Sequence, residues 1–404
     1  MIRFWQKLKN LYHLAQAWYW RLYFGQPDRG MKIYGVTGTN GKTTTCYLLT
    51  SILGKEYGVK KTGMLTTVAF RIGEKEISNE TKMTTLPSRL VFDYLGKMRT
   101  AGVNQVVLEM TSHALDQNRL FGIKLDGAAI LNIACEHLDY HRTMTEYAAA
   151  KLKILNYVRD GGTIVHRQFP IPNSQFPNLE LIQFSAKDAA DVVTSLLGEV
   201  NKENVLAASL LARAAGVKEE NIASGVAAVK LVPGRMEWVK PKFSMTNDQF
   251  PISGLPRVLI DYAVTPDALE RLYKEVKRQT KGKVFAVLGA CGLRDRGKRP
   301  DMARAAARFT DEVVLTREDP WTEDEEQIFT DLEKGLEKTD KKWRRIVDRR
   351  EAIRYCLERA GKDDVVVVTG KGAEQGMAIG KKIVLWSDRE VILEEMEDLA
   401  ERKT

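Results

Sequence analysis

The sequence predicts an α/β protein: a phosphate-loop domain built on a mostly parallel sheet, then a Rossmann-like C-terminal domain, with a short amphipathic helix in front. Two patterns carry this prediction. Apolar strands alternate with amphipathic helices along most of the 404 residues, as in parallel sheets covered by helices. A glycine-rich loop follows the first strand and opens a helix, which is typical of phosphate-binding loops.

The N-terminal segment, residues 1–30, is expected to be a basic, aromatic helix. Its apolar residues recur at steps of three or four and predict one apolar stripe: Phe4, Leu8, Leu11, Ala15, Trp18 and Leu22. The first 32 positions hold six Lys or Arg and one acid, Asp28. Two interpretations are open: residues 1–24 lie on the inner face of a membrane, or the stripe packs onto the next domain.

The central domain is expected to span residues 31–233 and the C-terminal domain residues 234–404, with the boundary near Pro233–Gly234. Strands are expected at 32–36, 105–108, 127–131 and 163–165 in the first domain, and at 258–261, 284–288, 312–316 and 365–369 in the second. The acid-rich stretch 323–327 predicts a solvated helix start.

The phosphate loop occupies residues 38–45, which read GTNGKTTT. Backbone N–H groups of such a loop close around phosphate oxygens, and the helix N-terminus adds a positive dipole. Lys42 is expected to reach the β- and γ-phosphates, and the Thr43 hydroxyl to bind Mg²⁺. The strict pattern GxxxxGK[ST] is missed by one position, because residue 36 is Val. The expected ATP-binding residues of the loop are Gly38, Thr39, Asn40, Gly41, Lys42, Thr43 and Thr44.

An acidic residue, Glu109, ends the strand 105–108, where a Mg²⁺ carboxylate belongs beside a phosphate loop. The motif EMTSHAL at 109–115, the motif NIACEHLDYH at 132–141 and the pair Tyr147 and Lys151 follow in order. With the phosphate loop, this ordered series resembles the Mur ligase family, in its tripeptide synthetase branch. The resemblance implies that Glu109 and His137 hold Mg²⁺, and that Lys151 carries a carbamate that holds a second Mg²⁺.

Further residues gain roles only through this resemblance. It implies nucleotide contacts at Asn201, Asn204, Arg235 and Asp261. It implies acceptor contacts at Thr84, Thr85, Thr111, Gln117 and Arg119, and amino-acid contacts at Arg299, Glu318, Asp319, Trp321, Gly370 and Glu374. The expected enzyme is a monomeric ATP-dependent, ADP-forming ligase of peptidoglycan precursor synthesis, which adds an amino acid to a muramoyl-dipeptide carboxylate through an acyl phosphate.

The sequence also departs from the family pattern. No UDP-binding domain precedes residue 31, and Val264 and Ala373 stand where the family has His. The specificity motif, DNPR in the diaminopimelate enzymes, reads Glu-Asp-Pro-Trp at 318–321, so the Arg that pairs with a distal carboxylate is missing. This favours L-lysine or a similar diamino acid over diaminopimelate.

Other functions remain open at this stage. The acceptor is a UDP-muropeptide, a lipid-linked muropeptide or a folylpolyglutamate-type substrate, and a non-catalytic scaffold that binds the precursor is a further alternative. The net charge of +9 suits an anionic partner, but the charge is diffuse after residue 32 and no DNA-reading motif is present, so nucleic acid is not expected. The widely spaced cysteines (Cys46, Cys135, Cys291 and Cys356) and the absence of an 18-residue apolar run indicate a cytoplasmic protein.

Overall fold

The computed structural model describes residues 2–134, 136–168, 170–171, 175–241 and 254–403. Cys135, one of the four cysteines, lies outside this range. The chain forms two compact units, one up to Lys230 and the other from Leu231 onward. Each unit is described by itself.

Unit 1 is built on an eight-stranded sheet with the order β4-β3-β2-β5-β1-β6-β7-β8. The strands are β1 (Lys32–Thr37), β2 (Thr62–Leu65), β3 (Ala69–Ile72), β4 (Lys75–Ser78), β5 (Gln105–Glu109), β6 (Leu125–Ile130), β7 (Val158–Arg167) and β8 (Glu180–Phe184). All pairings are parallel except those of β3 with β2 and with β4. β1 lies between β5 and β6, so the carboxyl ends of the three strands meet at one edge.

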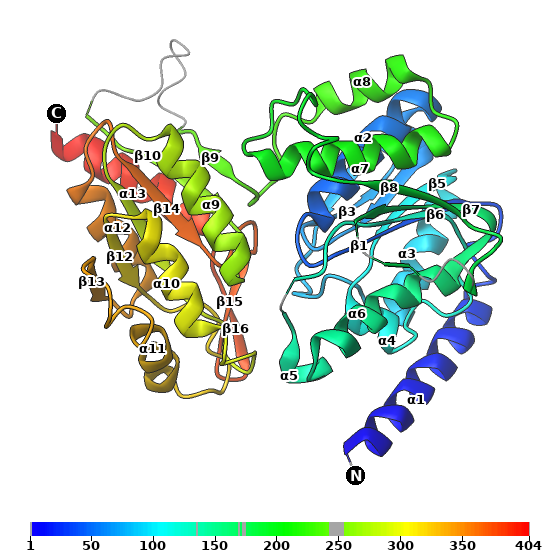
Figure 1. The fold of residues 1–404 in the computed structure, drawn as a ribbon, viewed down its shortest axis with the longest axis horizontal. Helices are drawn as coiled ribbons and strands as arrows, with labels where there is room; N and C mark the ends of the chain where they lie inside the picture. Colours follow the sequence, from blue (N-terminus) through cyan, green and yellow to red (C-terminus); the bar gives the residue numbers. More distant parts are fainter. Residues whose placement is uncertain (1, 135, 169, 172–174, 242–253, 404) are drawn as a thin grey trace. The chain divides into compact units, whose positions relative to one another are not determined.

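Helices cover both faces of this sheet (Figure 1). α2 (Lys42–Tyr57), α7 (Glu199–Ala214) and α8 (Glu219–Ala228) pack together on one face, and α3 (Ser88–Thr100), α4 (Ser112–Asp116) and α6 (Met144–Leu152) lie on the other. The short α5 (Leu138–His141) precedes α6, and single 3₁₀ turns occur at Val59–Lys61 and Lys153–Tyr157. All residues of β5 are buried, as are all residues of β6 except Asp126, and most of them are apolar, as expected for a sheet covered on both faces.

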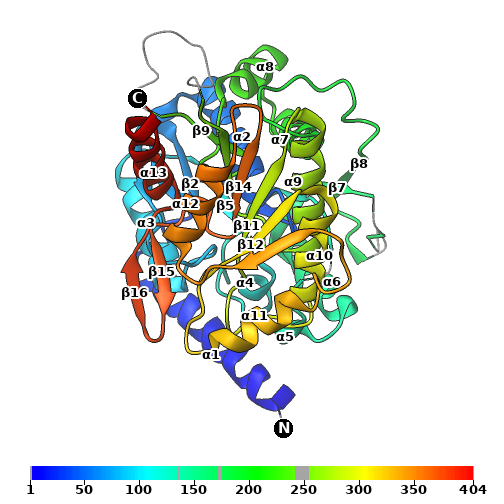
Figure 2. The ribbon, with the colours of Figure 1, turned by 90° about the vertical axis from the view of Figure 1, so that its left-hand side faces the viewer.

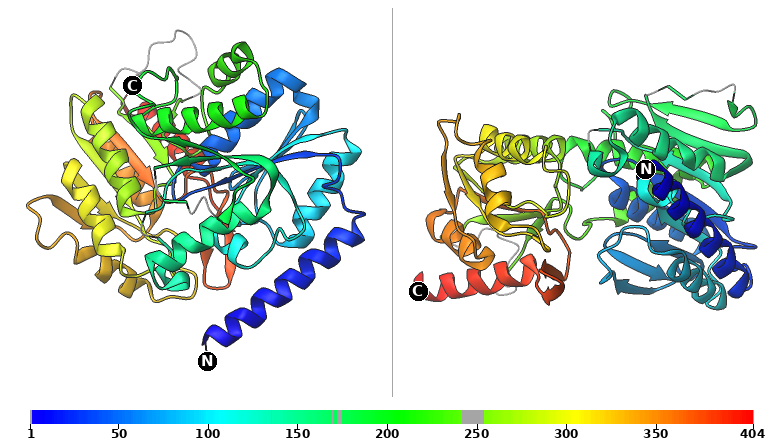
Figure 3. Two further views of the ribbon diagram at one scale, coloured as in Figure 1. Left: turned by 45° about the vertical axis from the view of Figure 1, so that its right-hand side comes forward. Right: turned by 90° about the horizontal axis from the view of Figure 1, so that it is seen from below.

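α1 (Ile2–Tyr23) precedes the sheet and packs against α3 (Figure 3). Ala17 is fully buried, and Trp20 and Phe24 pack against the core of unit 1. No helix among the described residues combines the length and the apolarity needed to cross a bilayer.

Unit 2 has a six-stranded sheet with the order β13-β12-β11-β14-β10-β9, in which only the edge strand β9 runs antiparallel. Its strands are β9 (Glu237–Val239), β10 (Arg257–Asp261), β11 (Val284–Leu288), β12 (Glu312–Leu315), β13 (Lys342–Arg345) and β14 (Val365–Thr369), followed by the hairpin β15 (Gly376–Ile379) and β16 (Lys382–Leu385). Figure 2 shows α9 (Pro266–Gln279) and α10 (Arg299–Phe309) on one side of the sheet and α12 (Arg349–Arg359) and α13 (Asp388–Lys403) on the other. The short α11 (Glu325–Glu333) packs on α10.

The predicted α/β class with mostly parallel sheets is confirmed, and all eight predicted strands are present. The strands at 284–288 and 365–369 have the predicted bounds, and the others differ by a few residues at their ends. The sequence analysis did not predict the strands β2, β3, β4, β8, β9, β13, β15 and β16, which are three to five residues long and most of which lie at or beside a sheet edge or in the hairpin. Such strands give only a weak alternation signal.

Candidate functional site

The phosphate loop connects β1 to α2 and is held in shape from several sides. Gly41 has φ 85°, and a Cβ placed there would come within 2.2 Å of the Asn204 side-chain oxygen. Glycine is therefore required both for the backbone conformation and for the close approach of α7. The backbone N–H of Asn40 donates to Asn132 Oδ1 (2.8 Å), and Asn132 Nδ2 donates back to the Asn40 carbonyl (3.0 Å).

Two lysines converge on the loop. Lys42 Nζ donates to the carbonyls of Gly38 (3.0 Å) and Thr39 (2.8 Å), and Lys151 Nζ donates to Gly38 (2.7 Å). Lys151 is buried and lies 4.6 Å from the centroid of the Tyr147 ring. Burial, together with the charge of Lys42, lowers the pKa of Lys151 well below its ordinary value.

The Glu109 carboxylate lies beside the start of α2. Thr43 Oγ1 donates to its Oε2 (3.0 Å), Thr67 Oγ1 donates to its Oε1 (2.9 Å) and the Thr67 N–H donates to Oε2 (2.9 Å). Glu109 is 3 % exposed, so the strand places an ordered, buried carboxylate next to the hydroxyl of Thr43. Two adjacent oxygen donors beside a phosphate loop fit Mg²⁺, which takes few protein ligands and completes its shell with phosphate oxygens and water.

His137 lies at the N-terminus of α5 with φ 55°. Its ring is 4.7 Å from that of His113 and 6.2 Å from that of Tyr147, and its Nε2 is 3.6 Å from Glu136 Oε2. Within the described part of the chain, no group of three His, Cys, Asp or Glu side chains could hold a metal ion. A metal bound at the predicted set therefore needs Thr43, the modified Lys151 or the substrate as additional ligands.

The five predicted acceptor residues form one linked network. Thr85 Oγ1 donates to the Glu109 carbonyl (2.9 Å), and the Thr111 N–H donates to Thr85 Oγ1 (2.9 Å). Arg119 donates from one nitrogen to the Thr85 carbonyl (3.0 Å) and from Nε to Gln117 Oε1 (2.8 Å).

The remaining member of the acceptor set, Thr84, is hydrogen-bonded through its hydroxyl to that of Thr67 (Oγ1 to Oγ1, 3.0 Å). Thr67 thus contacts both the acceptor network and the Glu109 carboxylate. The predicted nucleotide residues Asn201 and Asn204 are buried on α7, where Asn204 Nδ2 donates to Asn201 Oδ1 (2.9 Å), and Thr44 is buried on α2. In unit 1, the structure therefore brings the predicted phosphate, carboxylate and acceptor residues to the same edge of the sheet.

In unit 2, a second set of predicted site residues lies at the carboxyl ends of β10, β12 and β14. Glu318 is buried between Gly289 and Gly370: a Cβ on Gly289 would lie 2.7 Å from the Glu318 Cβ, and one on Gly370 would lie 2.3 Å from its Oε2. That Oε2 has no hydrogen-bond partner. Burial, together with the charge of Asp319, raises the pKa of Glu318 to about 7.

The neighbouring acid, Asp319, already has hydrogen-bond partners within the protein. Asp319 Oδ1 accepts from Lys371 Nζ (2.8 Å) and from the Ala378 N–H (2.8 Å), and Lys371 Nζ also donates to Glu374. Of the two acids that replace the family's specificity motif, Glu318 is therefore the one with an unpartnered oxygen. Trp321, with φ 52°, donates its backbone N–H to the Ala378 carbonyl (3.1 Å).

The predicted hinge-side residues Arg235 and Asp261 are close in unit 2. Arg235 stacks on the Tyr262 ring (4.5 Å), and Asp261 Oδ2 accepts from the Met236 N–H (2.7 Å). Burial raises the pKa of Asp261.

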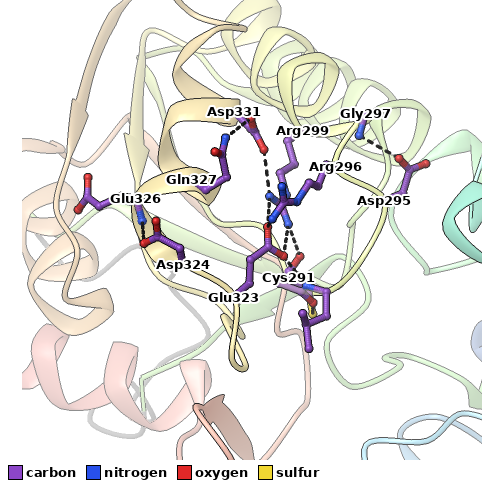
Figure 4. Close-up of polar contacts among 12 residues, drawn as sticks. Cys291, Asp295, Arg296, Gly297, Arg299, Glu323, Asp324, Glu326, Gln327 and Asp331 are labelled. Carbon is purple, nitrogen blue, oxygen red and sulfur yellow. Dashed lines mark hydrogen bonds and ion pairs between the residues drawn. The ribbon is translucent and has the colours of Figure 1, made fainter.

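Arg299 is fully buried and engaged within the protein (Figure 4). One of its terminal nitrogens donates to Glu323 Oε1 (2.8 Å) and Asp331 Oδ2 (3.1 Å), and the other donates to Glu323 Oε2 (2.9 Å). Binding of a substrate carboxylate by Arg299 would require these acids to move. The stretch 323–327 does include the start of α11 at Glu325. Its first acid is not solvated as expected: the Glu323 side chain is 3 % exposed, because Arg299, Arg296 and the Leu293 N–H surround it.

Several residues of the site carry no obvious sequence signal. Thr67 belongs to no motif, and its contact with Glu109 depends on strand pairing between β2 and β5. Tyr140 and Asp116 lie in recognisable motifs, but the hydrogen bond between them (2.8 Å) links α5 to α4 and only appears in three dimensions. Lys371 was recognisable as part of TGKGAE, although its pairing with Asp319 was not.

A phosphate loop on a parallel sheet, joined to a second α/β unit with a buried acidic cluster, defines a nucleotide-dependent ligase fold. Residues 36–191 match the Mur ligase middle domain, and residues 234–372 match the Mur ligase glutamate ligase domain. The chain is 35 % identical to the UDP-N-acetylmuramoyl-L-alanyl-D-glutamate–2,6-diaminopimelate ligase of Geobacillus thermodenitrificans, over 91 % of this chain and 79 % of the relative. The chain belongs to the Mur ligase family, whose members are ATP-dependent, amide-bond-forming enzymes.

Other relatives agree with this assignment. The UDP-N-acetylmuramyl-tripeptide synthetase of a Roseiflexus species is 34 % identical over 91 % of this chain and 78 % of its own length. A solved structure of a UDP-N-acetylmuramoyl-L-alanyl-D-glutamate–2,6-diaminopimelate ligase matches with a TM-score of 0.58 and 28 % identity, covering 97 % of this chain and 83 % of that one. The Mycobacterium tuberculosis folylpolyglutamate synthase matches with a TM-score of 0.69, but at 18 % identity it shares the fold alone.

Proposed function

We propose that this protein adds an amino acid to the carboxylate of a muramoyl-dipeptide acceptor, with ATP converted to ADP and phosphate. One observation carries the proposal: Glu109 joins the phosphate-handling and acceptor-binding groups. Its carboxylate accepts from Thr43 at the start of α2, and its backbone carbonyl accepts from Thr85 of the acceptor network. A reaction that transfers a phosphoryl group onto a bound carboxylate requires this proximity.

The proposed chemistry has two steps. The acceptor carboxylate attacks the γ-phosphorus of ATP, which forms an acyl phosphate and releases ADP. The amine of the amino acid then attacks the acyl carbon, and phosphate leaves as the amide forms. Lys42 would turn from the loop carbonyls to the phosphates, and Arg119 would hold a carboxylate of the acceptor with its planar fork.

Magnesium fits the residues of unit 1. Thr43, Glu109, His137 and a carbamoylated Lys151 would hold two Mg²⁺ ions, which neutralise charge on the transferring phosphoryl group. The burial and the lowered pKa of Lys151 support the modification, because only a neutral amine adds to CO₂. The central nucleotide-binding domain would comprise residues 31–233, and residues 234–404 would bind the amino acid.

We further propose that the amino acid is a diamino acid. Glu318 supports this, since its unpartnered oxygen offers a place for a distal ammonium. Trp321, in contrast, has no positive charge to pair with a distal carboxylate. Gly370 and Glu374 adjoin the same cluster, and Asn201, Asn204, Arg235 and Asp261 would contact the nucleotide. The enzyme is proposed to act as a monomer in the cytoplasm, in contact with the membrane through residues 1–24.

The test is a matrix of acceptors against amino acids with phosphate release as the readout. The acceptors are a UDP-linked muramoyl-dipeptide, its lipid-linked form and a folate. Phosphate release that requires both a muramoyl acceptor and an amino acid supports the proposal. Phosphate release with the folate and an amino acid, but with neither muramoyl acceptor, would indicate a folylpolyglutamate activity instead. Nucleotide binding without any turnover would indicate a scaffold.

A further inference from the structure

Helix α1 turns its apolar side outward. Apart from Lys9, its exposed side chains are uncharged, recur at steps of three and four and form one stripe: Leu8, Leu11, Tyr12, Ala15, Trp18, Tyr19, Leu22 and Tyr23. Leu11 and Tyr12 are each 62 % exposed, Trp18 57 % and Tyr23 66 %. A surface helix of a water-soluble domain normally buries its apolar side, so this orientation is inverted.

The apolar stripe is not exposed because the helix is detached from the protein. The opposite side of α1 is fixed to unit 1, because Ala17 is buried, Trp20 packs against the core and the Arg89 guanidinium lies over the Trp20 ring (5.5 Å). The interpretation in which the stripe packs onto the central domain is therefore wrong for its described members. In Figure 3, α1 runs along one side of unit 1 with its N-terminal end projecting.

The charges of α1 indicate what covers the stripe. The helix contains Arg3, Lys7, Lys9 and Arg21 and no acid, and Arg21 donates to Asp28 (2.9 and 2.8 Å). Tyrosine and tryptophan beside lysine and arginine suit the boundary between lipid headgroups and acyl chains, where the rings enter the interface and the cations meet anionic headgroups. Another copy of the same basic helix would bring like charges together.

The same helix contacts the acceptor network. Gln6 Nε2 donates to the Tyr140 hydroxyl (2.7 Å), and Asn10 Nδ2 donates to Asp116 Oδ2 (3.2 Å). Tyr140 in turn donates to Asp116 (2.8 Å) and accepts from Gln117 Nε2 (3.3 Å), which belongs to the proposed acceptor site. A chain of two hydrogen bonds, from Gln6 to Tyr140 and from Tyr140 to Gln117, thus connects the helix to a residue of the proposed acceptor site.

We propose that α1 docks the protein on an anionic membrane surface through its apolar stripe and holds the acceptor site at that surface. The acceptor would then be carried on a lipid. The docking stands on α1 alone, whereas the lipid-borne acceptor rests on the function proposed above.

The docking is tested by co-sedimentation of the full chain with phosphatidylglycerol vesicles and with neutral phosphatidylcholine vesicles, at low and high salt. We expect binding to the anionic vesicles that falls as salt rises, and more than tenfold weaker binding for the triple variant Leu11→Glu, Trp18→Glu and Tyr23→Glu. These side chains are exposed, so the variant should fold. The matched control changes three exposed apolar residues elsewhere, Val193→Glu, Trp343→Glu and Leu385→Glu, and should bind like the wild type.

Two results would overturn the docking: the full chain stays in the supernatant with anionic vesicles at low salt, or the triple variant binds as well as the wild type. A wild type that dimerises through the stripe, with the triple variant monomeric and neither binding vesicles, would identify a second copy as the occupant instead. None of these measurements requires turnover, so a failure of the proposed ligase activity leaves them interpretable.

The link to the acceptor is tested by kinetics. With a lipid-linked acceptor in vesicles, the triple variant should lose more than tenfold in kcat/KM, while its activity on a water-soluble acceptor stays unchanged. Gln6→Ala together with Asn10→Ala should raise the KM for the acceptor severalfold without changing vesicle binding or kcat. Equal loss on both acceptors for the triple variant, or an unchanged acceptor KM for the double variant, would show that α1 does not serve the acceptor site.

Discussion

Lys42 is held by the carbonyls of Gly38 and Thr39, and a nucleotide phosphate would replace these two partners. Lys42→Ala should lower kcat for ligation by about a thousandfold, because a positive charge aimed at the transferring phosphoryl group is lost. ADP and amide formation would be measured, with the exposed Lys55→Ala at the end of α2 as the control. AMP and pyrophosphate as products of the wild type would exclude the acyl-phosphate route.

Lys151 is expected to act only when modified. Its buried position beside Gly38 and Tyr147 favours the neutral amine, which is the form that reacts with CO₂. Lys151→Ala should lose at least about a hundredfold in kcat, and short carboxylic acids should restore part of it by supplying the missing anion. The variant Lys151→Arg keeps a cation but cannot form the carbamate, so it should stay inactive. Full activity of either variant would make Lys151 a structural residue.

Glu318 gives a pH-dependent test of the amino-acid side. Its raised pKa of about 7 means that the carboxyl group is neutral below that pH and ionised above it. Burial raises this pKa most, Asp319 and Glu374 raise it further, and Lys371 and Arg349 lower it. Only the ionised form attracts a distal ammonium. The KM for a diamino acid should therefore rise as the pH falls through about 7.

The variant Glu318→Gln should raise that KM by about thirtyfold, the scale of a lost buried charge partner, and should remove its dependence on pH near 7. Competition between L-lysine and diaminopimelate measures the preference directly, with the exposed Glu337→Gln as the control. A KM for L-lysine that Glu318→Gln leaves unchanged would refute the role given to Glu318, and a strong preference of the wild type for diaminopimelate would refute the preference inferred from Trp321.

Short motifs, and for Thr85 the family resemblance, were enough to predict residues that lie together in unit 1. Lys42 begins α2, Glu109 ends β5 and Thr85 precedes α3, and parallel strands bring such positions to one edge. The partners that fix them were not predictable. Thr67 reaches Glu109 only through strand pairing, and the engagement of Arg299 by Glu323 and Asp331 depends on how α10 packs on α11.

At the scale of secondary-structure elements, Arg349 ties α12 to α13 and β14. It is fully buried, donates twice to Asp388 (2.8 and 2.6 Å) and donates to the Thr369 carbonyl (2.8 Å). Arg349→Ala leaves Asp388 buried without its cation and should lower the free energy of unfolding by about 3–5 kcal/mol.

Urea unfolding of the full chain would measure this change, provided that the transition of unit 2 is followed. Arg402→Ala is the matched control, because Arg402 forms an ion pair with Glu358 at the surface, where such pairs contribute about 0–1 kcal/mol. Similar destabilisation by the two variants would show that burial does not decide the contribution of Arg349.

The orientation of α1 illustrates what periodicity cannot decide. The spacing of apolar residues in α1 predicts a helix with one apolar stripe; the helix is confirmed at Ile2–Tyr23. The periodicity of the sequence shows which residues lie on the same side of the helix, but it does not show which side faces the protein. That choice depends on partners far away in sequence, namely Tyr140 and Asp116 for the polar side and the core of unit 1 for Ala17 and Trp20.

For the molecule as a whole, alternating strands and helices were enough to predict two α/β units, because buried parallel strands leave the clearest apolar runs. The chain divides after Lys230. The proposed phosphate and acceptor residues belong to unit 1, and the proposed amino-acid residues and Arg235 belong to unit 2.

Because the proposed residues are divided between two units of one chain, neither unit should suffice for the reaction, and the protein is expected to act as a monomer. Lys42→Ala removes a group of unit 1, and Arg235→Ala removes one of unit 2. A mixture of the two inactive variants should stay inactive, since every chain lacks one required group, and light scattering should give a mass near 45.6 kDa. A variant carrying both substitutions, mixed with wild type, controls for inhibition by inactive chains. Activity recovered in the mixture, together with twice the monomer mass, would mean that the two units act across neighbouring chains.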